Sequence, residues 1–209
     1  MKYVVTLSLL LVSLTTYTQN RTPIWAFPSC GNTIHGIAVG LADIKDSCIT
    51  NVNGIRLEAI GLGLGVGFLG YHPSYDVNDS ILMNQPPTGT INGINLSLFG
   101  TIKFDNLNGL TIGGFAQALN NVNGVMISLA GNISTEFSGL QLSVMGNDAY
   151  SVKGLQLCMV SNSVHDLKGV QIGLINQSQK TKGFQIGLWN INEKRKLPII
   201  NWCFSSSSK

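Results

Sequence analysis

Large apolar residues alternate with small or polar ones in short segments that recur along most of the chain. Clear copies begin at a glycine, as in Gly154-Leu-Gln-Leu-Cys-Met and Gly169-Val-Gln-Ile-Gly-Leu. In the copies from Gly139 to Gly183, positions one, three and five after the glycine are large and apolar, whereas positions two and four are Gln, Gly, Ser or Cys. A period of two is typical of a β-strand with one buried face. The pattern therefore predicts strands that bury positions one, three and five.

The copies recur at a nearly fixed interval. Glycines mark them at spacings of 16, 15, 15, 15, 15 and 14 residues: Gly93, Gly109, Gly124, Gly139, Gly154, Gly169 and Gly183. A fixed period means that one small structural unit is copied many times. A second apolar column lies two residues before the glycine in the copies up to Gly169, as at Val152 and Leu167. For both columns to be buried, the chain must bend at the glycine, which accepts positive φ. We therefore expect a corner at each repeat glycine.

These repeats predict an all-β fold, and two kinds of architecture satisfy them. In a β-solenoid of about 15-residue repeats, equivalent positions stack in parallel about 4.8 Å apart. One ladder would then contain Gln141, Gln156, Gln171 and Gln185. In an antiparallel β-meander or an outer-membrane β-barrel, Asn-Gly pairs such as Asn123-Gly124 would form hairpin turns. A translational repeat gives every copy the same environment, and for this reason we favour the solenoid.

The domain organisation follows from the parts that depart from the repeat. Residues 1–18 contain one Lys, an apolar stretch and a polar end, which is the pattern of a secretory signal peptide. Residues 19–204 form a single repeat β domain. It contains an insertion loop at 71–90, which holds three prolines, and ends in a terminal strand at 199–204. Residues 205–209 are expected to be a disordered tail.

All four cysteines follow the predicted signal peptide. Cys30 and Cys48 bracket a short segment and could pair in an oxidising compartment, but pairing cannot be read from their spacing. Cys158 occupies a repeat position that neighbouring copies fill with Gly or Ser, so it is expected to be a small core residue. The chain has no Cys-x-x-Cys pair and no histidine at ligand spacing, so we predict no metal site and no cofactor.

Charged residues make up 11% of the chain, and the net charge of +3 is spread along it. This distribution does not resemble a nucleic-acid-binding surface. Acidic residues of the repeats, such as Asp148 and Asp166, occur singly in the connections, where solvated turn residues are expected rather than paired catalytic carboxylates. His165 beside Asp166 is interpreted in the same way. We therefore predict no catalytic residue.

The densest polar and aromatic cluster lies in the insertion loop and consists of Tyr71, His72, Tyr75, Asp76 and Asp79. Loops often carry function, and His72 with the two aspartates could hold a cation or a glycan. The alternative is an exposed loop that packs its tyrosines on the sheet, since no metal-binding spacing is matched. These five residues are the candidate ligand-binding loop, and they would also serve a polysaccharide-processing enzyme.

The segments Gly169-Val-Gln-Ile-Gly-Leu-Ile-Asn and Gly183-Phe-Gln-Ile-Gly-Leu-Trp-Asn resemble bacterial surface-repeat proteins of Bacteroidetes and spirochaetes. The segment Leu197-Pro-Ile-Ile-Asn-Trp resembles the end of many Bacteroidetes members. This resemblance covers about residues 36–204. It implies an exported protein of the cell surface, outer membrane or periplasm of a Gram-negative bacterium, without established activity or catalytic residues.

We therefore expect a non-catalytic surface-repeat protein that is structural or a binding scaffold. In this hypothesis a neutral face lined by Gln and Asn binds a glycan or an envelope protein. The first alternative is an outer-membrane β-barrel, because Ile200, Trp202 and Phe204 alternate as a closing strand would. The second alternative is the polysaccharide-processing enzyme.

Overall fold

The computed structural model describes residues 24–26, 31, 33–42, 49–63, 87–103 and 105–204. These residues form eleven strands, which lengthen toward the C-terminal half. The strands are β1 (Ile24–Ala26), β2 (Thr33–Gly40), β3 (Thr50–Glu58), β4 (Gly89–Ser97), β5 (Asp105–Gly113), β6 (Ala116–Ser128), β7 (Gly131–Leu142), β8 (Gly146–Leu157), β9 (Ser161–Ile172), β10 (Ile175–Ile191) and β11 (Lys196–Cys203).

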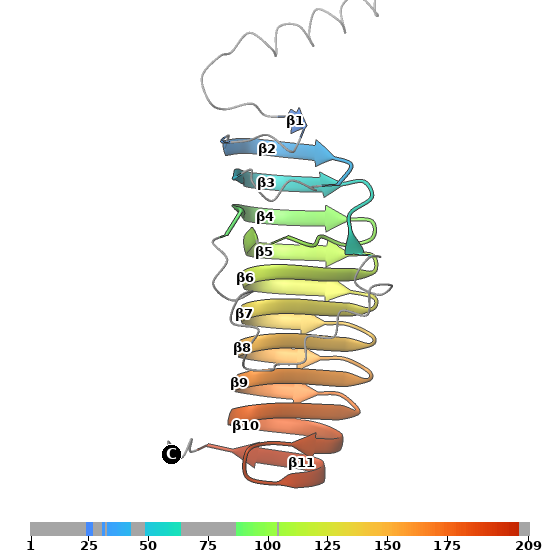
Figure 1. Ribbon diagram of the computed structural model, residues 1–209, viewed down its shortest axis with the longest axis vertical. Coiled ribbons are helices and arrows are strands. Elements are labelled where there is room, and N and C mark those ends of the chain that lie inside the picture. The colour runs from blue at the N-terminus through green and yellow to red at the C-terminus, as the bar shows by residue number, and fades with distance from the viewer. Residues whose placement is uncertain are drawn as a thin grey trace, which may run out of the picture.

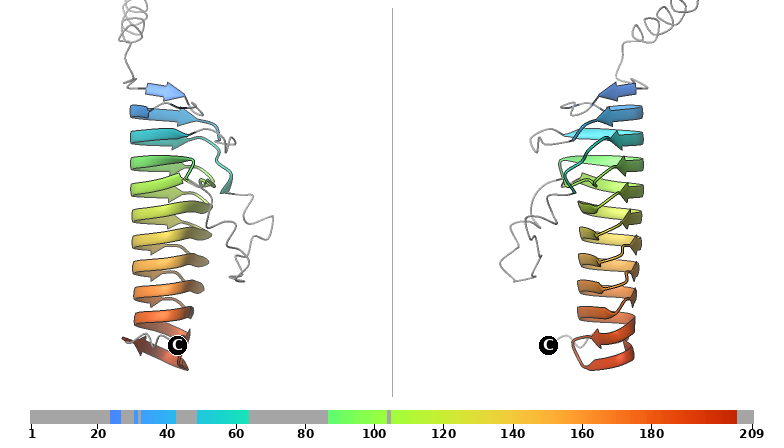
Figure 2. Two further views of the ribbon diagram at one scale, coloured as in Figure 1. Left: turned by 60° about the vertical axis from the view of Figure 1, so that its left-hand side comes forward. Right: turned by 90° about the vertical axis from the view of Figure 1, so that its right-hand side faces the viewer.

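All eleven strands belong to one sheet, in which each strand pairs with its neighbours in sequence order. Successive strands from β1 to β10 pair in parallel, whereas β11 pairs with β10 in the antiparallel direction. Figure 1 shows the strands stacked along the long axis of the molecule, and Figure 2 shows the same stack from two further sides. The β-solenoid is confirmed, and the antiparallel alternatives are wrong.

Two predicted boundaries differ from the structure. Gly89 and Thr90, which the sequence assigns to the insertion loop, already belong to β4. The terminal strand begins at Lys196 rather than at residue 199. The Asn192 amide donates to the Arg195 carbonyl, which closes a tight turn between β10 and β11. The predicted signal peptide, insertion residues 71–86 and the tail at 205–209 lie outside the described residues.

The repeat glycines lie directly above one another, in a column that runs from Gly36 in β2 to Gly183 in β10. Their φ angles are positive, as predicted, and that of Gly154 is 143°. A Cβ atom on Gly154 would lie 2.0 Å from the carbonyl oxygen of Gly139 in the preceding coil. Both the backbone conformation and this close approach therefore require glycine.

The predicted buried face is wrong. Leu140, Leu155 and Val170 share one column, but they are half-buried on the outer side of the sheet. The interior is lined instead by the positions two before and two after the glycine, such as Val152 and Gln156, which are both 0% exposed. These two positions are four residues apart, so they lie on the same side of a strand that continues through its glycine.

The predicted corner at the glycine is therefore wrong as well. The alternation of buried and half-buried residues changes phase earlier, at Tyr150 and Ser151, which separate the buried Ala149 and Val152. Tyr150 also drops out of the register with β9. This phase change locates the corner of the coil, and Val152 then begins the side that contains the glycine.

Half of the interior is apolar, and its main column is the one two residues before each glycine. All of its members are 2% exposed or less: Ile34, Val52, Ile91, Leu107, Val122, Phe137, Val152 and Leu167. Burial of each such side chain contributes about 1.5–3 kcal/mol of hydrophobic free energy. This column is the apolar part of the core that the sequence predicts correctly.

The other half of the interior is polar and consists of stacked side-chain amides. Gln141, Gln156, Gln171 and Gln185 form the predicted ladder, but inside the coils. The Nε2 of each of the last three donates to the Oε1 of the glutamine in the preceding coil, over 2.8, 2.8 and 2.9 Å. Because buried amides need partners, the ladder makes this polar interior stable.

A second buried ladder runs the opposite way. Each asparagine Nδ2 donates to the Oδ1 in the following coil, over 2.8–3.0 Å, and the same Nδ2 also donates to a backbone carbonyl ten residues later. The ladder consists of Asn132, Asn147, Asn162, Asn176 and Asn190. Small residues lie against it: Cys158 is 4% exposed, which confirms it as a small core residue, and Gly173 follows in the next coil.

We predict that Asn147→Ala lowers the free energy of unfolding by about 2–3 kcal/mol, because it removes the acceptor of Asn132, the donor to Asn162 Oδ1 and one of the two donors to the Leu157 carbonyl. Urea unfolding followed by circular dichroism measures this change. The matched control is Asn123→Ala. Asn123 is exposed and donates a hydrogen bond to Asn108, which water replaces in the variant. Equal losses in the two variants would contradict a stabilising role of the buried ladder.

We predict that Gly154→Ala destabilises the protein by at least about 2 kcal/mol, since alanine is strained at this φ and its Cβ meets a backbone oxygen. Gly131→Ala is the control, because the nearest atom to its added Cβ is the Gly146 oxygen at 3.2 Å and its φ is not positive. Thermal unfolding of both variants compares them. A Gly154→Ala protein that melts like the Gly131→Ala protein would refute the close-approach argument.

Candidate functional site

The outer side of the strands forms one continuous apolar surface, here called the apolar face. It consists of the positions one and three after each repeat glycine, and it spans β2 to β11, about 43 Å. The first column is Ile37, Ile55, Ile94, Leu110, Val125, Leu140, Leu155, Val170, Phe184 and Trp202. The second column is Val39, Leu57, Leu96, Ile112, Ile127, Leu142, Leu157, Ile172, Ile186 and Ile200.

The turns that follow the strands extend this surface. Met159, Leu174 and Leu188 lie five residues after their glycines and are 66%, 52% and 69% exposed. Over β8 to β10 the far side of the coils is more polar, because Asp148, Ser163 and Gln177 stack there in register. In these three strands the outside of the solenoid therefore has an apolar face and a more polar far side.

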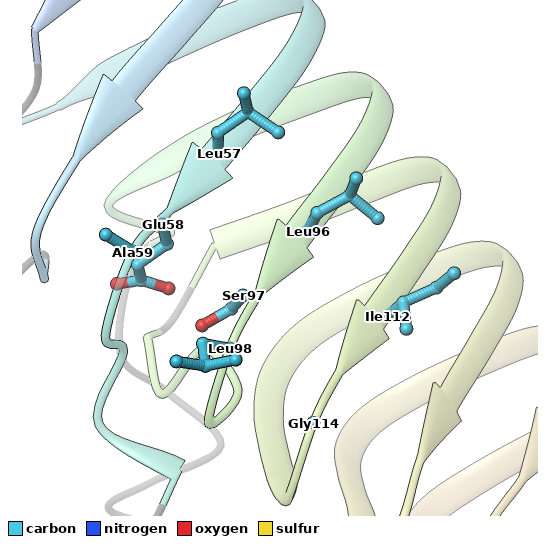
Figure 3. Close-up of a pocket in the computed structure, with 8 residues that line it drawn as sticks. All are labelled: Leu57, Glu58, Ala59, Leu96, Ser97, Leu98, Ile112 and Gly114. Carbon is cyan, nitrogen blue, oxygen red and sulfur yellow. The ribbon is translucent and has the colours of Figure 1, made fainter.

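A shallow depression of about 400 Å³ lies in the apolar face at β3 to β5. Figure 3 shows Leu57, Leu96 and Ile112 projecting from three neighbouring strands, with Glu58 and Ser97 on the other side of those strands. Gly114 contributes to the depression, because the equivalent positions in the neighbouring coils carry Leu98 and Leu129. The depression is lined by apolar atoms and continues the face rather than forming a separate polar site.

One edge of the apolar face is lined by the residue before each glycine. In β3 to β6 this residue is asparagine, and the amides of Asn92, Asn108 and Asn123 each donate to the asparagine of the preceding coil over 2.7–3.0 Å. In β8 to β10 it is lysine, and the exposed Lys153, Lys168 and Lys182 stack in register. Like charges in adjacent strands repel one another, so an anionic partner would stabilise this lysine row.

Aromatic side chains gather at the C-terminal end of the apolar face. Phe184 contacts Phe204 edge to face with 5.1 Å between ring centroids, and Trp202 is 44% exposed. The Arg195 guanidinium lies 4.4 Å from the centroid of the Trp202 ring and donates to Asn201. The most aromatic part of the face thus also carries fixed positive charge.

A cluster of buried charges fills the interior near β3 to β5. Arg56 Nη1 lies 3.4 Å from Asp105 Oδ2, and Arg56 Nη2 lies 4.0 Å from Glu58 Oε1. Lys103 Nζ lies 4.0 Å from Asp105 Oδ1, and Thr101 donates to Glu58 over 2.7 Å. All four charged residues are 4% exposed or less. They connect the coils of β3 and β5, and the expectation that the repeat charges are solvated is wrong for Lys103 and Asp105.

The sequence signal for this cluster lies in β3. Arg56 and Glu58 stand two and four residues after Gly54, and the first of these positions is held by glutamine in the C-terminal copies. A charge at a position that alternates with Ile55 and Leu57 must lie on the other side of the strand. Once that side is known to be the interior, the pattern requires buried counter-charges.

The predicted ligand-binding loop and the candidate disulfide are not described. Tyr71, His72, Tyr75, Asp76 and Asp79 lie outside the described residues, and so do Cys30 and Cys48.

The predicted acidic residues of the repeats are described, and they are not brought together. Asp148 is in register with Ser163, whereas Asp166 is in register with Ser151 and Lys180.

His165 and Asp166 form a contact in β9. His165 Nδ1 lies 3.3 Å from Asp166 Oδ1, and the imidazole stacks on Tyr150 with 4.6 Å between centroids. Asp166 also pairs with Lys180 over 3.7 Å. These contacts join β8, β9 and β10 at the corner of the coil, which agrees with a structural interpretation of the pair.

Among the described residues, Cys158 and Glu193 have shifted pKa values. Burial raises the pKa of the Cys158 thiol above its ordinary value, so the thiol stays protonated at neutral pH. Burial also acts to raise the pKa of Glu193, but hydrogen bonds from its own backbone, Cys203 and Thr181 outweigh it and leave this pKa below the ordinary value. The shift of Cys158 thus arises from packing in the core, and that of Glu193 from hydrogen bonds in the C-terminal return.

Within the ranges that the structure describes, no three His, Cys, Asp or Glu side chains are placed to hold a metal ion. The same residues contain no helix of the length and apolarity needed to cross a bilayer. The chain matches no protein-family model, and no curated protein or solved structure is significantly similar to it. The surface-repeat resemblance therefore stays a prediction, and the apolar face is the candidate functional surface.

We predict that Asp105→Ala lowers the free energy of unfolding by about 3 kcal/mol, because it leaves Arg56 and Lys103 buried beside one fewer counter-charge. The control is Asp166→Ala, which breaks a partly exposed ion pair with Lys180 and should change stability much less. Denaturant unfolding of both variants provides the comparison. A loss for Asp166→Ala as large as that for Asp105→Ala would contradict the assignment of the cluster to the core.

Proposed function

We propose that this protein is an exported, non-catalytic scaffold of the bacterial envelope that binds its partner through the apolar face. One observation carries the proposal: both outward columns are aliphatic or aromatic in every strand from β2 to β11. The apolar face is about 43 Å long and about five residues wide, which corresponds to a projected area of about 700 Å². Soluble monomers rarely leave a contiguous apolar patch of this size uncovered.

This proposal replaces the expectation that a neutral face lined by Gln and Asn binds the partner. The Gln and Asn ladders are buried, and their hydrogen bonds are made within the solenoid, so they offer nothing to a ligand. Recognition of a free glycan needs polar groups that converge on its hydroxyls. The apolar face offers aliphatic side chains instead, which favours an apolar component of the envelope over a soluble glycan.

A non-catalytic role agrees with the use of the charged side chains in the described repeats. Arg56, Glu58, Lys103 and Asp105 pair with one another in the core, and Asp166 pairs with Lys180 between coils. These contacts stabilise the stack. Export is supported by the signal-peptide pattern of residues 1–18 and leads us to propose the cell surface, the outer membrane or the periplasm as the location.

The test combines cell fractionation with a change in the face. We predict that Leu157→Gln combined with Ile172→Gln moves the tagged protein from the envelope fraction to the soluble fraction, because both side chains lie in the middle of the apolar face. Leu157 is 38% exposed, so the fold should tolerate the change, and the urea midpoint of the purified variant verifies this.

Ser163→Asn combined with Gln177→Ser is the matched control, since both residues are on the far side, Ser163 in the strand of Ile172 and Gln177 in the next strand. This control should remain in the envelope fraction. A folded face variant that stays with the envelope as firmly as the control would contradict binding through the apolar face.

A further inference from the structure

We infer that the partner of the apolar face is the surface of a lipid bilayer that contains anionic lipids, on which the solenoid lies with its long axis along the membrane. The inference rests on the proposed function and specifies its partner. The face would enter the boundary between headgroups and acyl chains, and the row of Lys153, Lys168 and Lys182 would contact the headgroups.

The first argument is the lack of polar groups in the face. A protein–protein interface has about one hydrogen bond per 100–200 Å², so a surface of this size should offer several donors or acceptors to a protein partner. The side chains in the two columns of the apolar face offer none apart from the Trp202 indole at one end. The backbone groups of the central strands are paired with strands on both sides, so the face can enter an apolar medium without leaving them unpaired.

The second argument is where the positive charges are. Lys153, Lys168 and Lys182 are one position before the repeat glycines, so they border the first apolar column directly. Their long side chains can keep the ammonium groups in water while the stems follow the apolar surface. Anionic headgroups would relieve the mutual repulsion of this row and attract each lysine.

The third argument is the aromatic end of the face. Trp and Tyr are enriched at the level of the headgroups, where an apolar ring and a polar edge both find suitable surroundings. Trp202 is 44% exposed at the C-terminal end, and Arg195 is fixed over its ring. Over β8 to β10 the opposite side carries Asp148, Ser163 and Gln177, so the apolar face suits a membrane better than the opposite side does.

The test uses the chain from residue 19 to residue 209 and vesicles of phosphatidylcholine alone or mixed three to one with phosphatidylglycerol. We predict that the protein floats with the mixed vesicles, that tryptophan emission shifts to shorter wavelength, and that binding weakens with salt. Replacing Lys153, Lys168 and Lys182 together by Gln should weaken binding to the mixed vesicles about 100-fold. The matched control replaces the same lysines by Arg, which keeps the charge and should keep the affinity.

The outcomes separate this inference from the proposed function. Loss of vesicle binding in the Leu157→Gln and Ile172→Gln protein supports the inference. Equal binding of the lysine-to-glutamine and lysine-to-arginine proteins would overturn it. The wild-type protein could instead bind neither kind of vesicle but sediment as a dimer, with the face variant sedimenting as a monomer. The partner would then be a second copy of the chain, and only the lipid inference would fail. The inference and the proposed function both fail if the wild-type protein is a monomer that binds neither kind of vesicle and if the face variant stays in the envelope fraction as firmly as the wild type.

Discussion

The structure depends on parallel stacking in register, because the buried amides find their hydrogen-bond partners one coil away. Asn147 accepts from Asn132 and donates to Asn162, whereas Gln156 accepts from Gln171 and donates to Gln141. An amide in the interior without its neighbours would be costly. The nearly constant spacing of the glycines follows from this requirement, since a shift of one residue would turn a ladder to the other side of the strand.

The polar interior determines what remains for the exterior. A coil with an amide at the second position after the glycine has its large aliphatic residues at the first and third positions, on the outer side of the same strand. The same alternation thus places the hydrogen-bonded amides inside the coils and the aliphatic residues of the apolar face outside. Stability does not require the outer residues to be aliphatic, because most of them remain partly exposed to solvent. Their uniform chemistry over ten strands points to a role outside the core.

The period, the parallel direction, the positive φ of the glycines and the small core residue Cys158 could all be predicted from the sequence. The buried side could not be predicted from hydrophobicity, because alternation does not say which face is inside. The spacing of four between Val152 and Gln156 carried that information, but a glutamine looks exposed unless its partners 15 residues away are considered. For the same reason the buried Arg56 was missed: its partner Asp105 is 49 residues away. Arg56 and Glu58 alternate with Ile55 and Leu57, which places both charges on one side of the strand, but local sequence does not identify Asp105 as the partner of Arg56.

The two amide ladders run in opposite directions, since the glutamines donate toward the N-terminal end and the asparagines toward the C-terminal end. The side-chain dipoles of one ladder therefore cancel those of the other. In an α-helix, by contrast, aligned peptide dipoles add up to partial charges at the two ends. A coil that carries both buried amides can therefore be added or removed with little change in the dipole along the axis of the solenoid.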